Sequence, residues 1–200
     1  IYNYSKLPMQ SIVFNLLIFI FVLIMGQYQK NRSIVFIKLR DWNLKLYNKF
    51  LSNPPYLDAD KVFPEHKILE ENWDSIYDEL TVVLKYRDLI PSFHEISKEQ
   101  YKISKGKRWK TFAFFSFGRK FKYNCSYAPN TVKLLECIPG LQSAWFSVIA
   151  PGYHVPKHKG ITRGILRGHL GLSIPKIAKE CFMDVGNDRI YWEQGKVVVF

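Results

Sequence analysis

Residues 166–174, LRGHLGLSI, alternate between apolar and other side chains, and this pattern restricts the fold more than any other in the chain. One face of the segment is apolar and carries Leu166, Leu170, Leu172 and Ile174. The opposite face carries Arg167 and His169, with Ser173 beyond them. A period of two residues is typical of a β-strand with one buried face. The alternative is a strand whose polar face simply meets solvent.

Further short strands are expected on both sides of this one. Residues 143–150, SAWFSVIA, are strand-like and end at the turn signal Pro151-Gly152. Residues 181–185 and 189–192 flank another turn, and residues 196–200 begin a further strand. Short strands separated by turns indicate an antiparallel barrel or sandwich, such as a jelly roll. We therefore predict a mainly β fold with flanking helices.

The predicted helices lie before these strands. An apolar stripe at helical spacing follows Pro64 and consists of Leu69, Trp73, Ile76, Leu80 and Leu84. Residues 86–110 are polar and are expected to form loops and short elements. Residues 111–117 are expected to form a strand, and residues 129–138 a short helix that starts at its proline.

An apolar run near the start of the chain predicts a membrane anchor within residues 1–26. Residues 12–25 are apolar apart from Asn15, and about twenty residues suffice to cross a bilayer. A cleaved signal peptide fits less well, because only Lys6 precedes the run and no small-x-small cleavage site follows it. Basic residues after the run place the rest of the chain on the cytoplasmic side of a single-pass membrane protein.

Residues 27–52 predict a basic amphipathic helix. Its apolar positions recur at helical spacing and are Val35, Leu39, Trp42, Leu46 and Phe50. Lysines and arginines on the other faces, with a tryptophan among the apolar residues, are typical of a helix in the membrane interface. The alternative is a helix packed on the following domain. Prolines 54 and 55 end the segment, so the globular domain is expected to span residues 53–200.

The net charge of +12 is compatible with an anionic partner, and a solvated basic surface is the alternative for most of the individual lysines. The basic residues are spread along the chain and no nucleic-acid motif accompanies them, so nucleic acid is not expected as a partner. Membrane lipid and an anionic small substrate remain as interpretations, and they can coexist. The 3 cysteines show no CxxC spacing, which argues against a disulfide framework or a structural zinc site.

Two places carry candidate chemistry. A barrel interior holding Arg167 and His169 would need an anion, because an unpaired buried charge is costly. Arginine forms bidentate pairs with carboxylates, so a bound carboxylate would satisfy this need. His158 follows the Pro151-Gly152 turn, and Pro156 excludes a helical metal pair with His154. Spacing alone leaves His158 open between a surface residue and a metal ligand.

Four segments resemble the aspartyl/asparaginyl β-hydroxylase family, which includes bacterial lipid A 2-hydroxylase relatives. They are NPPYLDADKVFPEHKILEENW (53–73), IPGLQSAWFSVIAPGYHVPKHKG (138–160), ILRGHLGLSIP (165–175) and YWEQGKVVVF (191–200). The resemblance implies a double-stranded β-helix, the jelly roll that the strand pattern also favours. It further implies a dioxygenase that uses Fe(II), dioxygen and 2-oxoglutarate to hydroxylate an unactivated C–H bond.

The resemblance assigns roles to individual residues. His158 would be an iron ligand, and Ser147, Arg167 and His169 would contact 2-oxoglutarate. The substrate would be a peptidyl Asp/Asn side chain or a lipid acyl chain at the membrane. The family's second iron-binding histidine and a further arginine would come after the strand at residues 196–200. We therefore expect a C-terminally incomplete domain that is inactive by itself.

Two positions depart from one or other branch of the family. Gly160 stands where the lipid A hydroxylases carry an acidic residue. The animal aspartyl hydroxylases resemble this chain in having glycine there. Ile165 stands where the animal enzymes place an arginine for the substrate carboxylate. The alternative function is a non-catalytic, membrane-anchored jelly roll that binds an anion or a lipid headgroup.

Overall fold

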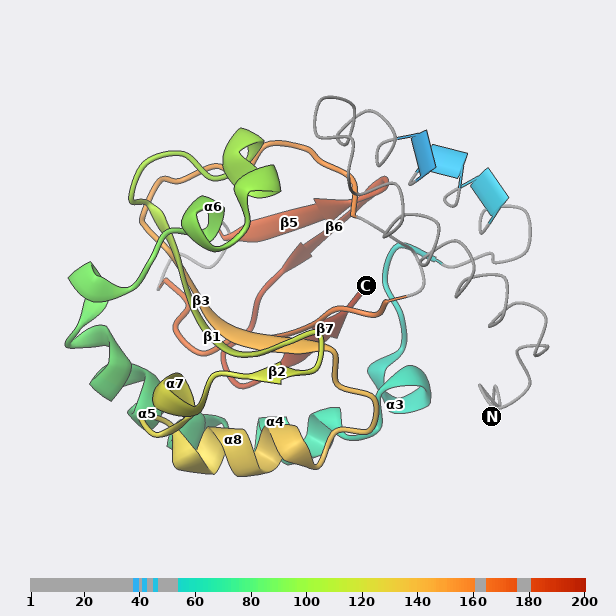
Figure 1. Cartoon of the computed structure of the whole chain (residues 1–200). Helices are drawn as coiled ribbons and strands as arrows, with labels where there is room; N and C mark the ends of the chain where they lie inside the picture. The colour runs from blue at the N-terminus through green and yellow to red at the C-terminus, as the bar shows by residue number, and fades with distance from the viewer. Residues whose placement is uncertain (1–37, 40, 43–44, 47–53, 161–164, 176–180) are drawn as a thin grey trace. The chain divides into compact units, whose positions relative to one another are not determined.

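The structure, a computed structural model, describes residues 38–39, 41–42, 45–46, 54–160, 165–175 and 181–200 (Figure 1). Pro55–Lys159 and Arg167–Phe200 form one compact unit, which corresponds to most of the predicted globular domain. Its elements position the candidate site.

The N-terminal predictions fall largely outside the described residues. Residues 38–39, 41–42 and 45–46 are helical, and the rest of the helix predicted over residues 27–52 lies outside the described residues. The predicted anchor, residues 1–26, lies outside the described residues. Within the described ranges, no helix has the length and apolar character needed to cross a bilayer. The anchor therefore stays a prediction.

The described strands pair antiparallel in three small sheets. The first sheet has the order β2-β1-β3, with β1 (Trp109–Ser116), β2 (Arg119–Lys120) and β3 (Ser143–Ile149). The other two are the pairs β4 (Gly168–Leu170) with β7 (Val197–Val199) and β5 (Phe182–Val185) with β6 (Asp188–Tyr191). The predicted strand segments are therefore confirmed, although β4 occupies only the centre of residues 166–174.

Helices fill the connections before and between β1 and β3. The α-helices are α3 (Ala59–Val62), α4 (His66–Glu71), α5 (Trp73–Leu84), α6 (Phe93–Ile96), α7 (Lys122–Cys125) and α8 (Pro129–Glu136). Two 3-10 helices, η3 (Arg87–Leu89) and η4 (Lys98–Lys102), lie in the polar stretch expected to hold short elements. The long helix predicted after Pro64 is divided in two at Asn72, whose φ of −115° and ψ of 19° depart from helical values.

Side-chain caps attach these helices to their neighbours. Glu79 of α5 accepts hydrogen bonds from the backbone N–H groups of Asn130 and Thr131, at 2.8 Å each, in the first turn of α8. The carboxylate thereby satisfies donors that a helix N-terminus leaves free. Glu70 of α4 accepts from the backbone N–H of Val197 at 2.7 Å, which ties β7 to the helix layer.

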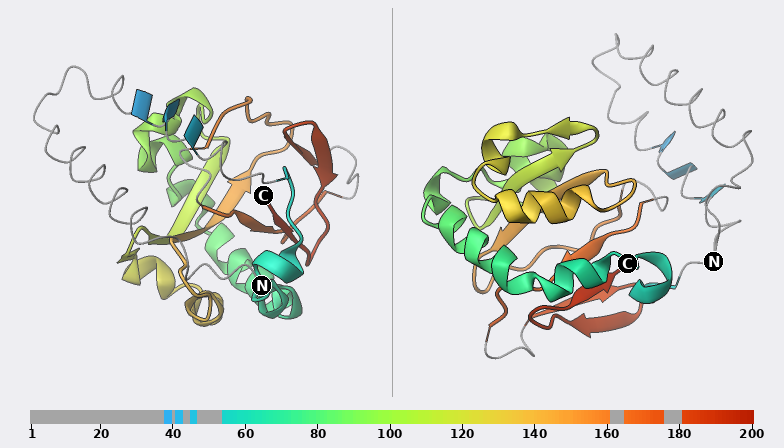
Figure 2. Two further views of the ribbon diagram at one scale, coloured as in Figure 1. Left: turned by 90° about the vertical axis from the view of Figure 1, so that its right-hand side faces the viewer. Right: turned by 90° about the horizontal axis from the view of Figure 1, so that it is seen from below.

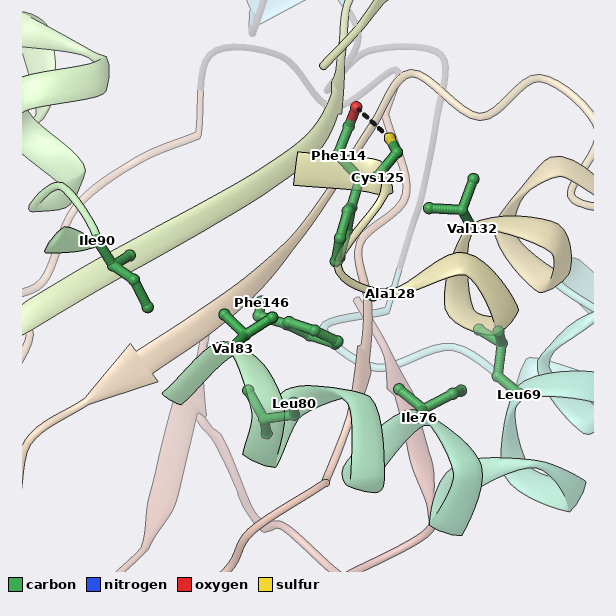
Figure 3. Packing of buried hydrophobic residues seen from close by; sticks show 10 residues of the cluster. All are labelled: Leu69, Ile76, Leu80, Val83, Ile90, Phe114, Cys125, Ala128, Val132 and Phe146. Atoms are coloured by element: carbon green, nitrogen blue, oxygen red, sulfur yellow. Dashed lines mark hydrogen bonds between the residues drawn. The ribbon is translucent and has the colours of Figure 1, made fainter. Parts of the chain in front are cut away.

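The core lies between the helices and one face of the strands (Figure 3). Ile76, Leu80 and Val83 of α5 are buried, and the rings of Phe114 and Phe146 meet edge to face with centroids 4.9 Å apart. The predicted stripe is confirmed at its buried positions, whereas Trp73 and Leu84 are only partly covered. Burying such side chains contributes about 1.5–3 kcal/mol each, so this layer fixes which face of each strand is turned inward.

Both main sheets turn one face to the helices α4, α5 and α8. On the other face, called the open face below, Ser147 and His169 are exposed, whereas Thr111 is buried. Figure 1 shows α4, α5 and α8 below β1, β3 and β7, and the view from below in Figure 2 shows them in front of the strands. Paired residues of an antiparallel ladder point to the same side. Phe112 and its partner Phe146 belong to the core face. Leu170 and its partner Val197 do so in the β4–β7 pair.

The predicted class, mainly β, is too narrow, since the described residues form a mixed fold of helices and antiparallel sheets. The sequence pattern was strongest in the strands after residue 143, whereas the helices before β3 supply a large part of the core. The double-stranded β-helix remains a prediction, because the described strands form separate small sheets.

Candidate functional site

His158 lies in the segment that leads from β3 to β4. Its side chain is exposed, and its Nδ1 lies 2.9 Å from the carbonyl oxygen of Pro156. Because a carbonyl can only accept, Nδ1 carries the proton and the lone pair of the neutral ring is on Nε2. A backbone carbonyl commonly orients a metal-binding histidine in this way. His158 is therefore suited to provide one metal ligand through Nε2.

Arg167 and His169 lie on the open face of the β4–β7 pair. Arg167 and Phe200 exchange backbone hydrogen bonds of 2.9 and 3.0 Å, and His169 pairs with Val198. These residues share a face, opposite to that of Leu170 and Val197. The alternation predicted from the sequence is therefore confirmed at this strand.

Two aromatic rings hold the imidazole of His169. The indole of Trp192 stacks against it with an interplanar angle of 15° and centroids 6.2 Å apart. The ring of Phe200 meets it edge-on at 89°, with centroids 4.8 Å apart. The two contacts fix the plane of the imidazole on the open face.

The electrostatics of this pair favour an anion. Burial among protein atoms, with a smaller contribution from the charge of Arg167, lowers the pKa of His169 from 6.5 to about 4. The imidazole is thus neutral at pH 7, even though His169 is exposed by accessible surface area. Burial also lowers the pKa of Arg167 from its ordinary value, while leaving the group charged.

The guanidinium of Arg167 has no carboxylate partner among the described residues. A partly buried cation without a partner is costly, and a bidentate carboxylate ligand would offset that cost. Arg167 and neutral His169 together can therefore receive a carboxylate, with the arginine supplying charge and the imidazole a hydrogen bond.

Ser147 lies on the open face of the β1–β3 sheet. Its Oγ accepts a hydrogen bond of 2.9 Å from the indole Nε1 of Trp109 on the neighbouring strand. Because this bond uses a lone pair of the hydroxyl, the Ser147 O–H is still available as a donor. An exposed, oriented hydroxyl of this kind suits a carboxylate oxygen.

The predicted site residues thus form three groups in the structure. Arg167 and His169 are close enough for the arginine to affect the imidazole's pKa. Ser147 is tied to Trp109, and His158 to Pro156. No group of three potential metal ligands occurs within the part of the chain that the structure describes. A metal at His158 would need ligands from outside that set, and Gly160 offers no side chain.

The second glycine of the RGHLGL segment, Gly171, is required by a close backbone contact. A Cβ added at Gly171 would lie 2.3 Å from the carbonyl oxygen of Glu193, which is too close for any other residue. Gly195 donates a 2.7 Å hydrogen bond to the carbonyl oxygen of Gly171. This close approach brings the segment containing Trp192 beside β4, where its ring can reach His169.

The aromatic residues of the site were missed by sequence reasoning. Trp109, Trp192 and Phe200 each contact a predicted site residue, but the contacts depend on strand pairing across many residues. The sequence offered one signal. Trp109 and Thr111 are two residues apart along β1, so their side chains lie on one face of the strand, the face that also carries Ser147 of the neighbouring strand.

Comparison with known proteins identifies the family. Residues 70–200 match the family model described as Aspartyl/Asparaginyl beta-hydroxylase. The chain belongs to this family.

Curated relatives include lipid and protein hydroxylases. The Ornithine lipid ester-linked acyl 2-hydroxylase of Rhizobium tropici is 37% identical over 167 residues, covering 82% of this chain and 59% of the relative. The human Aspartyl/asparaginyl beta-hydroxylase is 35% identical over 168 residues, covering 80% of this chain and 21% of the relative. Mouse Aspartate beta-hydroxylase domain-containing protein 2 is 30% identical over 159 residues, or 75% of this chain and 44% of the relative. The chain thus spans well under two thirds of each relative.

Proposed function

We propose that this chain is part of a hydroxylase that depends on Fe(II) and 2-oxoglutarate. The observation that carries the proposal is the pairing of Arg167 with a neutral His169 on an open sheet face, without a carboxylate partner for the arginine among the described residues. An anionic co-substrate supplies that partner. Membership in a family whose curated relatives are named as hydroxylases supports the same conclusion.

Each site residue has a distinct role in this proposal. Arg167 pairs with a carboxylate of 2-oxoglutarate, while His169 and Ser147 add neutral hydrogen bonds that orient it. His158 presents Nε2 as one iron ligand, with Nδ1 held by Pro156. Bound iron supplies the oxidative chemistry. In the balanced reaction, 2-oxoglutarate, dioxygen and a C–H bond give succinate, carbon dioxide and a C–O–H group.

The substrate is a lipid acyl chain or a peptidyl Asp/Asn side chain. The lipid is favoured by the open face of the β1–β3 sheet, where Trp109, Trp145 and Ile149 accompany Ser147 without a charged residue on that face of the two strands. The Rhizobium relative is named for an acyl chain. The peptide is favoured by the human relative's name and by Gly160.

Succinate release tests the proposal. The full-length product of the gene is incubated with Fe(II) and 2-oxoglutarate, and then with ornithine-lipid vesicles or with Asp/Asn-containing peptides. We expect one substrate class to stimulate succinate release, with an equal amount of hydroxylated product and complete loss on chelation of the metal. Release that no substrate stimulates and no chelator inhibits would contradict the proposal.

The proposed location is the cytoplasmic face of a membrane, with residues 1–26 as a single-pass anchor and residues 27–52 in the interface. The full-length protein should stay with membranes after a high-salt wash, whereas a chain starting at Asn53 should not. Salt screens the basic residues but leaves apolar burial intact. Complete release of the long protein by salt would leave only peripheral binding.

A non-catalytic, anion-binding module is the second candidate. One observation favours it, namely that the described residues contain no group of three potential metal ligands. Such a module would bind 2-oxoglutarate or a lipid phosphate without releasing succinate. Anion binding in the absence of any metal-dependent turnover by the full-length protein would select this alternative.

A further inference from the structure

Thr111 carries a buried hydroxyl for which the described residues provide no hydrogen-bond partner. The residue lies in β1 and is 2% exposed, and its Oγ1 makes no hydrogen bond with the described part of the chain. Its backbone N–H is bonded, since it donates to the carbonyl oxygen of Pro91 at 3.0 Å. The hydroxyl is therefore the unsatisfied group at this position.

The register places this hydroxyl beside Ser147. Thr111 is the direct partner of Ser147 in the β1–β3 ladder, so the two side chains lie on the same face. Directly opposed residues have Cβ atoms about 4.5–5.5 Å apart. The two hydroxyl-bearing side chains are therefore direct neighbours, and because the Thr111 Oγ1 is shielded from solvent, one carboxylate can bond to both hydroxyls only if the groups that cover Thr111 move.

Aromatic rings border this hydroxyl pair. Trp109 and Trp145 lie on the same face, one on each strand and on opposite sides of the pair. The ring of Phe93 contacts both indoles, with centroids 4.6 Å from Trp109 and 6.1 Å from Trp145. Thr111 is covered while Ser147 stays exposed, so a ligand would enter from the Ser147 side. Hydrogen bonds formed next to these rings are stronger than in water.

A hydroxyl in this position is not expected for stability alone. An unpaired buried donor costs free energy, whereas an apolar group of the same shape would avoid that cost. Valine has the same shape as threonine without the hydroxyl, and it suits a strand at least as well. Residues that lower stability in this way are expected at functional sites.

We propose that Thr111 is a further binding residue of the co-substrate site, where its hydroxyl and that of Ser147 together hydrogen bond to one carboxylate of 2-oxoglutarate. This inference rests on the proposed function. Arg167 and His169 hold the other carboxylate of the same ligand, and the two strands of the β1–β3 sheet contribute one neutral donor each.

The test compares three variants of the full-length protein, Thr111→Val, Thr111→Ser and Ser143→Ala. Ser143 is the matched control, because its buried hydroxyl also has no partner among the described residues. It lies four residues from Ser147 on the same strand, about 13 Å away. Thermal unfolding is measured without ligand, and 2-oxoglutarate binding is measured by calorimetry with a redox-inert divalent metal.

We expect Thr111→Val to unfold at the same or a higher temperature than the wild type and to bind 2-oxoglutarate about three- to tenfold more weakly. Thr111→Ser and Ser143→Ala should bind it like the wild type. Unchanged affinity in Thr111→Val, a lower unfolding temperature in that variant, or equal weakening in Thr111→Ser would overturn the inference. If the wild type itself does not bind 2-oxoglutarate, the proposed function fails instead.

Discussion

The two open sheet faces of the domain differ in the kind of group that each presents. The β4–β7 face presents a guanidinium and an imidazole, Arg167 and His169, between aromatic rings. The β1–β3 face presents hydroxyls and indoles and no charged side chain. Both faces lie opposite the core face of their sheets, and Ser147 and His169 are exposed on them, whereas Thr111 is covered.

This difference indicates that the two faces contribute differently to ligand binding. A charged pair contributes more than a neutral hydrogen bond, so the β4–β7 face should determine affinity for an anion. The neutral donors of the β1–β3 face should determine how that anion is oriented. His158 belongs to the segment between β3 and β4, and its side chain is exposed.

The largest effect is expected from His158→Ala in the full-length protein. Loss of a proposed iron ligand should reduce succinate release to background, because the described residues contain no group of three potential ligands that could hold the metal instead. His154→Ala is the matched control, since His154 is also exposed in the same segment and has no assigned role. If His158→Ala releases succinate at the wild-type rate, His158 is not an iron ligand of the reaction.

Arg167→Gln should have the next largest effect. Removing a charge-assisted carboxylate pair costs about 1.5–3 kcal/mol, which corresponds to a roughly ten- to hundredfold higher KM for 2-oxoglutarate. Arg189→Gln is the control, because Arg189 already pairs with Asp184 at 2.6 Å on the exposed β5–β6 hairpin. Equal KM values for the two variants would mean that the β4–β7 face does not hold the anion.

Ser147→Ala should weaken the same ligand less. A neutral hydrogen bond contributes about 0.5–1.5 kcal/mol, or roughly two- to tenfold in KM for 2-oxoglutarate. Ser126→Ala serves as the comparison, since its hydroxyl donates to the carbonyl oxygen of Tyr123 far from the two faces. A larger loss in Ser147→Ala than in Arg167→Gln would reverse the assignment of the faces.

The last prediction concerns the pH dependence of stability and His169. Because its pKa is about 4 in the folded protein against 6.5 for a free imidazole, the unfolded chain binds a proton between these values and the folded chain does not. Stability should therefore fall as the pH falls from about 6.5 toward 4. The free energy of unfolding, measured with urea at pH 7 and pH 4.5, should decrease less between these two pH values in His169→Gln than in the wild type. Identical pH slopes would mean that the imidazole is as freely protonated in the fold as in the unfolded chain.

The features that involve residues close together in the sequence were predicted from local patterns. The alternation through Arg167 and His169 predicted their common face, and the β4–β7 register confirms it. The apolar stripe predicted the buried side of α5, although not the interruption at Asn72. These features depend on the period of a helix or strand, which a sequence records directly.

Contacts between distant segments could not be predicted in the same way. The bond from Trp109 to Ser147 and the stacking of Trp192 on His169 depend on which strands pair and in what register. The contribution of the helices to the core was also underestimated. The helices before β3 join one core only because they cover the sheets, and that packing depends on contacts between distant segments. Closure of the strands into a jelly roll remains a prediction.

The most direct test of the account is calorimetric titration of 2-oxoglutarate into the full-length protein with a redox-inert divalent metal. The wild type and the double variant Arg167→Gln/Ser147→Ala are compared. If both faces hold one co-substrate, one molecule binds per chain, and the double variant binds it more weakly than either single variant. Two molecules per chain, or wild-type affinity in the double variant, would contradict the account.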